Sequence, residues 1–435
     1  MKKVLKTHFI IIVLFCFWFI PFTSASSELS SSHITINALL EDHPTVRVIA
    51  KLLPEFENET GIRVNIDVIP FEAMTQRARE TLNEKSDHYD VYMDGWVNAI
   101  EWASQEHLEP LDEYVKQADV NQYIDMEDFI EAYITDARYK DKQYGLPIYG
   151  ESTFLYYRKD LFSSYGIKPP ETMEEIKTAA KRFKENNPNM YPITFRGREG
   201  VHIVYIWSSF LWGFGGRWLD DEGKLDLDSP EAVQSAFFFT DLLRNYGPPA
   251  STTFGWSENR DLFLKGKAAM SIDATVNGAF NENPKFSMVA GKVGYIATPK
   301  LSTAILKGGQ SSLVTHQMYM NKYGKNKNAA FIFISWATSK NVQLRSIQIE
   351  PNCGMTSKSA INSSIFLEKF GAFKNSMLES LANGNPNYLP IIPEAPVIFQ
   401  KVGKALSDIL SGNSSAKDAL KNVNRELNDI IAKKS

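Results

Sequence analysis

The fold is decided by the stretch Gly145–Ser152, GLPIYGES, which continues through Leu155–Phe162, LYYRKDLF. Its glycine and proline, followed by apolar and aromatic residues, predict a turn, an extended strand and then the start of a helix. One carboxylate, Glu151, lies within this strand. An acidic side chain inside an apolar strand is costly unless it faces a wet cleft or a charged partner. We therefore expect Glu151 to face a ligand cleft, with a salt bridge to a neighbouring lobe as the alternative.

Upstream of this stretch, alternating strand and helix patterns predict an open, mainly parallel α/β sheet. Residues 33–39 and 62–69 have strand patterns, and residues 46–59 between them carry apolar side chains at helical spacing. A strand, a helix and a strand within about 40 residues form the parallel βαβ unit. Residues 89–93 predict a third, buried strand. Ligands bind such sheets outside the carboxyl ends of the strands.

Candidate ligand-binding residues follow two of these predicted strands. They are Asp42, His43, Asp94 and Trp96. Loops at strand ends often carry binding residues, which favours a functional interpretation of all four. Three have a structural alternative, because Asp42 would serve as the cap of the helix behind it, Asp94 as part of a surface turn, and Trp96 as a core ring.

Downstream, the chain is expected to cross repeatedly between two lobes. Thr172 and Glu175 form a capping box that predicts a helix to about residue 186. Residues 268–273 predict a second crossover strand that returns to the first lobe, where residues 294–299 form a strand. Residues 312–320 predict a third crossover. We expect the following division: lobe 1 from residues 26–148 and 273–312, and lobe 2 from residues 149–272 and 313–435.

The N-terminus has the pattern of an export signal. Three lysines among the first six residues precede an almost wholly apolar run over residues 9–22. This run is too short to span a bilayer comfortably, which takes roughly 20 residues. We expect residues 1–25 to be a signal peptide cleaved after Ala25, with a retained anchor helix as the alternative. Cys16 suggests a lipoprotein, but the bulky Phe15 before it argues against one.

Composition excludes several other classes of protein. The formal net charge of −4 offers no basic field for nucleic acid. Cys16 and Cys353 are the two cysteines, so the mature chain would hold no internal disulfide and no cysteine-based zinc site. Seven histidines are scattered without metal-ligand spacing, so we predict no metal site. Aromatic residues make up 12% of the chain, and flat rings pack well on the C–H faces of sugars.

Several motifs together carry a resemblance to a known family. Besides the opening stretch they are residues 196–200 (RGREG), 215–220 (GGRWLD), 272–276 (IDATV), 289–294 (VAGKVG) and 331–340 (FIFISWATSK). By their order and spacing the chain resembles the family 1 extracellular solute-binding proteins of carbohydrate ABC importers, and within them the sorbitol/mannitol (polyol) branch. The resemblance implies an α/β fold of the type II periplasmic-binding-protein-like class, with two α/β lobes joined by crossover strands around a ligand cleft.

The resemblance also implies how the protein works. It would be a monomer that captures a sugar or polyol and delivers it to membrane permease subunits, without cofactor or catalytic residue. It would be exported to the periplasm, or to the cell surface if there is no outer membrane. Glu151 would accept hydrogen bonds from sugar hydroxyls, as the corresponding glutamate does in the family.

Further candidates come from the crossovers and their loops. They are Arg196, Trp256, Asp273 and Gln310. Carboxylates accept two hydroxyl donors, arginine donates in a fork, and an indole offers a stacking platform. The structural alternative for Arg196 is an ion pair with Glu199.

The chain departs from the polyol branch at three places. It has Val201-His202 where that branch has Gly-Trp, Gly309–Ser312 where the branch has a Trp-rich strand, and no arginine near Pro351–Gly354. These departures leave the importer role intact and leave the ligand open.

Two other functions share part of this evidence. A secreted carbohydrate-active enzyme would need paired carboxylates about 5–9 Å apart, and no recognisable hydrolase motif supplies them. A receptor for a polyamine or a peptide would share the fold, and a polyamine would favour more acidic residues and fewer arginines in the cleft.

Overall fold

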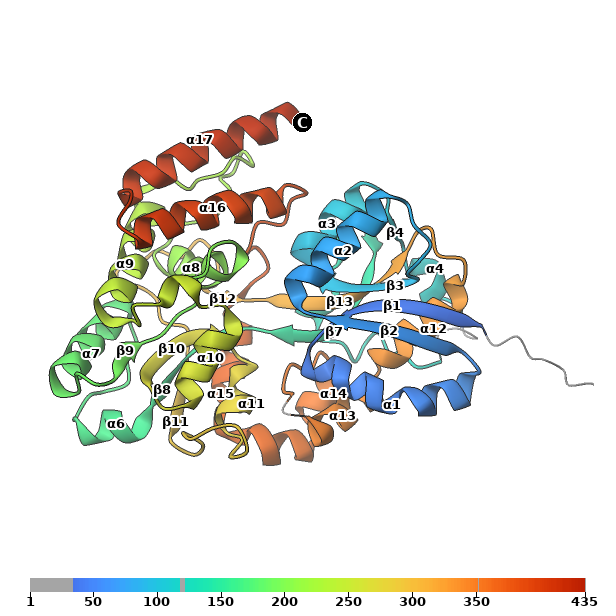
Figure 1. Ribbon diagram of the computed structural model, residues 1–435, viewed down its shortest axis with the longest axis horizontal. Helices are drawn as coiled ribbons and strands as arrows, with labels where there is room; N and C mark the ends of the chain where they lie inside the picture. The colour runs from blue at the N-terminus through green and yellow to red at the C-terminus, as the bar shows by residue number, and fades with distance from the viewer. Residues whose placement is uncertain (1–33, 118–121, 351, 435) are drawn as a thin grey trace, which may run out of the picture. The chain divides into compact units, whose positions relative to one another are not determined.

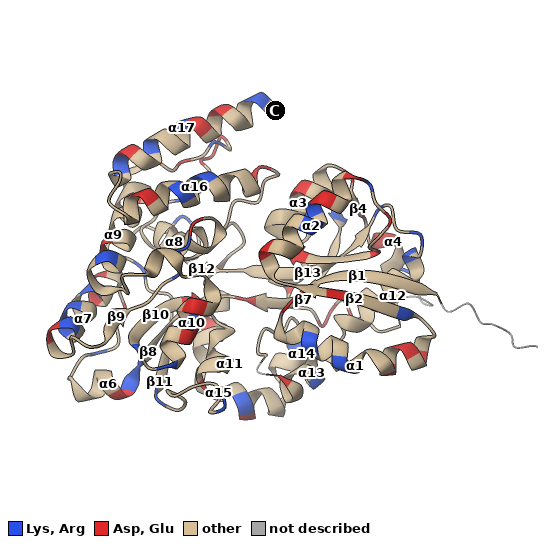
Figure 2. Cartoon of the chain, viewed as in Figure 1, with Lys and Arg blue, Asp and Glu red and all other residues tan. Residues whose placement is uncertain are grey.

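The computed structural model describes residues 34–117, 122–350 and 352–434. The predicted signal peptide, residues 1–25, lies outside the described residues. Among the described helices, none is both long enough and apolar enough to cross a membrane. Charged residues of both signs are interspersed on helices such as α7 (Met173–Asn186) and α17 (Ala416–Lys434) (Figure 2).

The first sheet begins with the predicted parallel βαβ unit. β1 (Thr35–Glu41) pairs in parallel with β2 (Arg63–Ile69) and with β3 (Val91–Gly95). The connecting helices are α1 (Pro44–Thr60) and α2 (Phe71–Asn83). Parallel strands need such crossover helices, since a tight turn cannot join them. The strand and helix predictions for this part of the chain are confirmed.

A strand from much later in the sequence completes this sheet. The strand order is β2-β1-β3-β13-β4, and β7 (Gly145–Glu151) also pairs with β13 (Val314–Asn321). β13 is antiparallel to β3 and to β7, and therefore lies between them. Figure 1 shows β7 and β13 extending from the first sheet toward the second.

The second sheet has four strands in the order β11-β8-β10-β9. Their bounds are β8 (Thr153–Arg158), β9 (Tyr191–Ile193), β10 (Ala268–Ala274) and β11 (Val293–Ala297). β8 follows β7 directly, so the predicted first crossover lies at the junction of these two strands. Side chains along β8 alternate between two cores, with Leu155 in one and Phe154 and Tyr156 in the other. This is the period of two expected of a strand covered on both faces.

The pairing of β11 and β13 corrects the expected lobe boundaries. We placed residues 273–312 in the first lobe, but β11 pairs with β8 of the second sheet. We placed residues 313–435 in the second lobe, but β13 belongs to the first sheet and the apolar residues of α12 (Lys327–Ala337) pack in its core. Local strand patterns cannot show which distant strand will be the partner. Below, "first lobe" and "second lobe" mean the elements packed around the first and the second sheet.

Helices cover both sheets. Besides α1, α2 and α12 they are α3 (Trp96–Ser104), α4 (Asp112–Val115), α5 (Glu131–Ile134), α6 (Lys159–Ser164), α7, α8 (Val201–Gly213), α9 (Pro230–Tyr246), α10 (Trp256–Leu264), α11 (Asn277–Asn281), α13 (Lys340–Ile349), α14 (Lys358–Ile361), α15 (Ser364–Ala382), α16 (Ala395–Leu410) and α17. The short elements are β4 (Leu108–Glu109), β5 (Arg138–Tyr139), β6 (Lys142–Gln143), β12 (Ser311–Ser312), β14 (Gly384–Asn385) and a 3₁₀ turn (Ser251–Thr253).

Local capping signals fix several of these helix ends. The predicted capping box at the start of α7 is present, with Thr172 and Glu175 each bonded to the backbone of the other. α1 is capped by His43, whose Nδ1 accepts a hydrogen bond from the Thr45 backbone N–H at 3.2 Å. The alternative interpretation of Asp42 as the helix cap is therefore wrong by one residue.

Candidate ligand-binding cleft

A cavity of about 380 Å³ lies between the elements of the two sheets. Its wall takes residues from the ends of β1, β7 and β13 on one side and from α8, α10 and their preceding loops on the other. The predicted site residues on the wall are Asp42, His43, Glu151, Arg196 and Trp256. The wall therefore joins segments that are far apart in sequence, as the crossover topology predicts.

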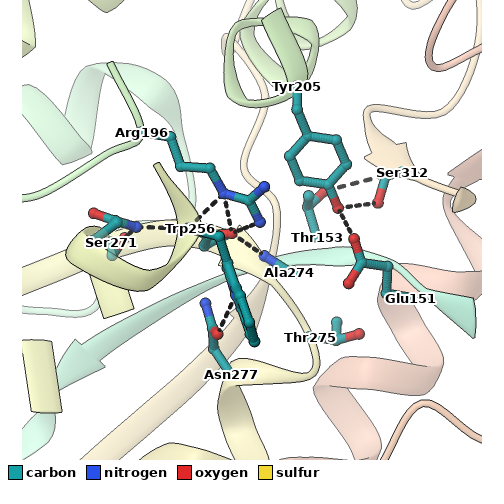
Figure 3. A network of polar contacts seen from close by, with 12 residues as sticks. Glu151, Thr153, Arg196, Tyr205, Trp256, Ser271, Ala274, Thr275, Asn277 and Ser312 are labelled. Atoms are coloured by element: carbon teal, nitrogen blue, oxygen red, sulfur yellow. Dashed lines mark hydrogen bonds and ion pairs between the residues drawn. The ribbon is translucent and has the colours of Figure 1, made fainter. Parts of the chain in front are cut away.

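Glu151 is the last residue of β7, at the point where the chain passes from one sheet to the other. The Tyr205 hydroxyl donates a hydrogen bond to Glu151 Oε1 at 3.0 Å and lies 3.0 Å from Ser312 Oγ (Figure 3). None of the ion pairs within the described residues includes Glu151, so the alternative of a salt bridge is not realised there. Burial raises the pKa of Glu151. The carboxylate is thus desolvated and suited to accept hydrogen bonds from a ligand.

A stack of three rings forms the first-lobe side of the wall. Tyr149 lies between His43 and His316, with ring centroids 3.9 Å and 4.4 Å away. His316 Nδ1 lies 2.9 Å from Glu41 Oε2, and the Tyr149 hydroxyl donates to the same oxygen at 3.3 Å. Burial by itself would raise the pKa of Glu41, but the facing imidazole outweighs it and lowers that pKa. Glu41 and His316 therefore form a charged pair behind Tyr149.

His43 has a fixed protonation state within this stack. Its Nδ1 accepts the Thr45 N–H, so the ring proton must lie on Nε2. Burial lowers the pKa of His43 to about 3, which keeps the ring neutral. His43 therefore presents a neutral, aromatic surface to the cleft.

Arg196 forms the second-lobe side together with Tyr205. Arg196 Nε lies 3.0 Å and 3.1 Å from the two carboxylate oxygens of Asp273, and its Nη2 also pairs with that carboxylate. The guanidinium stands 4.6 Å from the centroid of the Tyr205 ring. Arg196 thus pairs with Asp273 rather than with Glu199, the alternative drawn from the sequence. The buried pair fixes the fork of a cation that lines the cavity.

Trp256 begins α10 and lines the same cavity. Its indole Nε1 donates to Asn277 Oδ1 at 2.8 Å (Figure 3). The Arg260 guanidinium lies 4.5 Å from its ring centroid. These contacts hold the half-buried indole in one orientation, as a stacking platform requires.

Four predicted site residues do not line the cavity. Asp273 is fully buried and acts through Arg196. Asp94 is also fully buried, and burial raises its pKa to about 6. Trp96 packs in the first-lobe core between Tyr144 and Tyr319.

Gln310, the fourth, is buried near the third crossover. Its amide donates to the Thr298 carbonyl at 2.8 Å, so it supports the backbone there. Asp42, by contrast, does line the cavity, but at its edge. Its side chain is 57% exposed and lies 2.8 Å from Arg47 Nη1.

Sequence reasoning missed several residues of the wall. They are Glu41, Glu72, Tyr149, Arg198, His202, Tyr205 and His316. Glu41 ends β1 and follows the same strand-end rule that selected Asp42. Tyr205 lies in the apolar helix α8, where an aromatic ring is indistinguishable from core. No group of three or more histidine, cysteine or acidic residues within the described parts of the chain is arranged to hold a metal ion.

Comparison with known proteins identifies the family. The sequence pattern of the family described as "Bacterial extracellular solute-binding protein" matches residues 43–344, more than half of the chain. This chain belongs to that family. The resemblance drawn from the sequence motifs is confirmed. The matched solute-binding family is one of binding proteins rather than of enzymes.

Individual members of the solute-binding family are similar over most of their length. A mannitol-binding protein of Pseudomonas aeruginosa is 28% identical over 381 residues, which cover 84% of this chain and 85% of the relative. An ABC transporter solute-binding protein of Agrobacterium radiobacter K84, solved with ribitol, has a TM-score of 0.84 and 26% identity, and covers 91% of this chain and 98% of its own. An ABC transporter solute-binding protein of Agrobacterium vitis S4, solved with D-mannitol, has a TM-score of 0.82 and 28% identity. The match covers 92% of this chain and 98% of that protein's chain. The predicted fold class, a type II periplasmic-binding-protein-like α/β fold, is confirmed.

Proposed function

We propose that this solute-binding protein is the ligand-capturing subunit of an ABC importer for a polyol or a small sugar. The observation that carries the proposal is that a carboxylate and a guanidinium line the same cavity between the two lobes. The carboxylate is that of Glu151, hydrogen-bonded to Tyr205, and the guanidinium is that of Arg196, paired with Asp273. Similar proteins bind mannitol and ribitol, which supports this class of ligand.

The chemistry of the wall suits vicinal hydroxyl groups. A carboxylate accepts two hydroxyl donors and a guanidinium donates to two acceptors, so together they match a chain of alternating hydroxyls. The rings of His43 and Trp256 supply apolar surface for the C–H groups of the ligand. A volume of about 380 Å³ is near the lower end of the roughly 300–1,000 Å³ of small-molecule sites. A monosaccharide or its alditol fits this range better than an oligosaccharide.

Capture would require no covalent step. A ligand that contacts both lobes stabilises the closed state, and this differential affinity alone drives closure. The closed complex would then deliver its ligand to permease subunits at the membrane. We place the protein outside the cytoplasm, in the periplasm or at the cell surface, as a monomer without catalytic activity.

A thermal-shift screen of the protein tests this proposal. Monosaccharides, disaccharides and polyols are compared with spermidine and ferric citrate. A ligand at 100 times its Kd adds about 2.7 kcal/mol to the free energy of unfolding. We expect the largest shift from a polyol or monosaccharide. A shift with spermidine alone would overturn the carbohydrate assignment, and turnover of sugar glycosides would overturn the assignment as a binding protein.

The Glu151→Ala variant tests the anchor of the site. We expect Kd to rise at least about a hundredfold, because each hydrogen bond to a charged group contributes about 1.5–3 kcal/mol. The ligand-free melting temperature should stay close to that of the wild type, since Tyr205 keeps Ser312 as a partner. Calorimetry measures the affinity, and Glu151→Gln, which keeps the shape, separates loss of charge from loss of volume. Unchanged affinity in the alanine variant would exclude Glu151 as an anchor.

A further inference from the structure

Three charged or titratable side chains meet at the edge of the cleft. Glu72 lies in the first turn of α2, in the first lobe. Arg198 lies in the loop before α8 and His202 in the first turn of α8, both in the second lobe. All three line the cavity. Contacts among them therefore join the two lobes.

One carboxylate oxygen receives both groups from the opposite lobe. Arg198 Nη2 lies 2.8 Å and His202 Nε2 lies 2.7 Å from Glu72 Oε1. The hydrogen bond from His202 is the main cause that lowers the pKa of Glu72 to about 2. The Glu72 side chain is 54% exposed and His202 only 12%, so the cluster reaches from solvent into the cleft.

Arg198 is also held by contacts within its own lobe. Its backbone N–H donates to the Phe254 carbonyl at 2.9 Å, which ties its loop to the segment before α10. Its guanidinium lies against Gly255, where an added Cβ would come within 2.5 Å of Nη2. A glycine at this position therefore leaves the space that the guanidinium fills.

Glu72 receives both of the ion pairs that bridge this edge of the cleft, from Arg198 in the loop before α8 and from His202 in its first turn. An apolar contact also joins the lobes, because Val97 of α3 packs in the second-lobe core. At this edge of the cleft, the attraction between charged groups of the two lobes therefore depends on the Glu72 carboxylate.

From this geometry we infer that Glu72 is a positioning residue that clasps the lobes together, through Arg198 and His202, once a ligand is inside. This inference rests on the proposed function, because a clasp of this kind acts by slowing release of the captured solute. These contacts lie at the edge of the cleft and must open before a bound solute can leave, so we expect Glu72 to affect the dissociation rate rather than the association rate.

The test compares Glu72→Gln with the wild type, with D-mannitol and ribitol as probes. We expect the dissociation rate constant to rise about fivefold, the upper range for a partly exposed ion pair, with the association rate constant unchanged. High salt should reduce the difference, because exposed charges are screened. Gly255→Ala, which displaces Arg198 without changing any charge, should raise the dissociation rate by a smaller factor.

Glu55→Gln is the matched control. It removes an exposed carboxylate that pairs with Arg345 at 2.9 Å, and neither residue lines the cavity. Both rate constants should remain those of the wild type. Dissociation from Glu72→Gln at the wild-type rate in low salt would overturn the clasp.

A ligand-independent measurement separates this inference from the proposed function. The imidazole of His202 is titrated by NMR in ligand-free wild type and Glu72→Gln. The Glu72 contact raises the pKa of His202 against the effect of burial and of Arg196 and Arg198, so the variant should titrate at lower pH. If no polyol or sugar of the thermal-shift screen binds the wild type, the proposed function fails while this shift would still support the clasp. An unchanged titration in that case would overturn the clasp as well.

Discussion

Asp94 and Asp273 occupy equivalent places in the two lobes and differ in one partner. Each lies at the carboxyl end of a strand and is fully buried. Each accepts the backbone N–H of the next residue, at 2.6 Å for Asp94 and 2.7 Å for Asp273. Each also accepts an asparagine amide, from Asn98 at 2.8 Å and from Asn259 at 2.6 Å.

The remaining donor decides what each carboxylate does. For Asp94 it is the neutral hydroxyl of Thr75, at 2.7 Å, and burial dominates to raise the pKa of Asp94 to about 6. For Asp273 it is the buried guanidinium of Arg196. The first aspartate therefore organises only its own lobe, whereas the second orients a cation on the cleft wall. Similar carboxylate geometry thus serves the core in one lobe and the binding site in the other.

The largest loss of stability is expected from Asp273→Asn. The variant keeps an acceptor for Ala274 and Asn259 but removes the charge of the carboxylate that is hydrogen-bonded to the buried Arg196 guanidinium. Removing one partner of a buried ion pair costs about 3–5 kcal/mol. Urea unfolding at neutral pH measures the loss, with Asp94→Asn as the matched control. Equal stability of the two variants would show that the guanidinium does not distinguish the two sites.

A smaller, pH-dependent effect is expected from Asp94→Asn. The pKa of Asp94 is about 6 in the folded state against 3.8 as its ordinary value, so the folded state binds the proton more tightly. Its contribution to stability is fully present below pH 3.8 and is lost as pH rises to about 6. The loss amounts to about 1–3 kcal/mol.

The measurement is the free energy of unfolding of wild type and Asp94→Asn between pH 4 and pH 7. Because asparagine does not titrate, the stability of the variant relative to the wild type should increase as pH rises through this range. A difference that stays constant with pH would show that Asp94 does not titrate in this window.

The smallest change in stability is expected at Asp42, a third aspartate at a strand end. Asp42 follows β1, but its side chain is 57% exposed and pairs with the partly exposed Arg47. Asp42→Asn should change the free energy of unfolding by less than about 1 kcal/mol. A chemical denaturation curve measures it. A loss as large as that of Asp273→Asn would mean that burial is not what separates the three aspartates.

Much of the fold could be predicted from local patterns. The first βαβ unit and the capping box of α7 depend on residues close together in sequence, and both are present. The single strand expected around Glu151 is instead two strands, β7 and β8, which belong to different sheets. The sheet membership of β11 and β13 could not be predicted, since it depends on partners distant in the chain.

The site was predicted less completely, for a physical reason. Position in the chain and residue type selected His43 at a strand end, Glu151 within an apolar strand and Arg196 in a crossover loop, and all three line the cleft. Position and residue type also selected Asp94 and Asp273, because neither shows whether a carboxylate turns toward the cleft or back to donors in its own lobe. Tyr149 and Tyr205 were missed because aromatic residues in apolar elements have the same pattern on a cleft wall as in a core.

The position of β13 also governs the order in which the molecule can be assembled. β13 separates β3 from β7, yet its residues are synthesised after the strands of the second sheet. Until it arrives, β3 and β7 each present an unpaired edge, which is a template for aggregation. Pairing over such a long sequence separation is also slow. The nascent first lobe therefore remains unfinished while the second is made, and no fragment that ends before Val314 contains a complete first sheet.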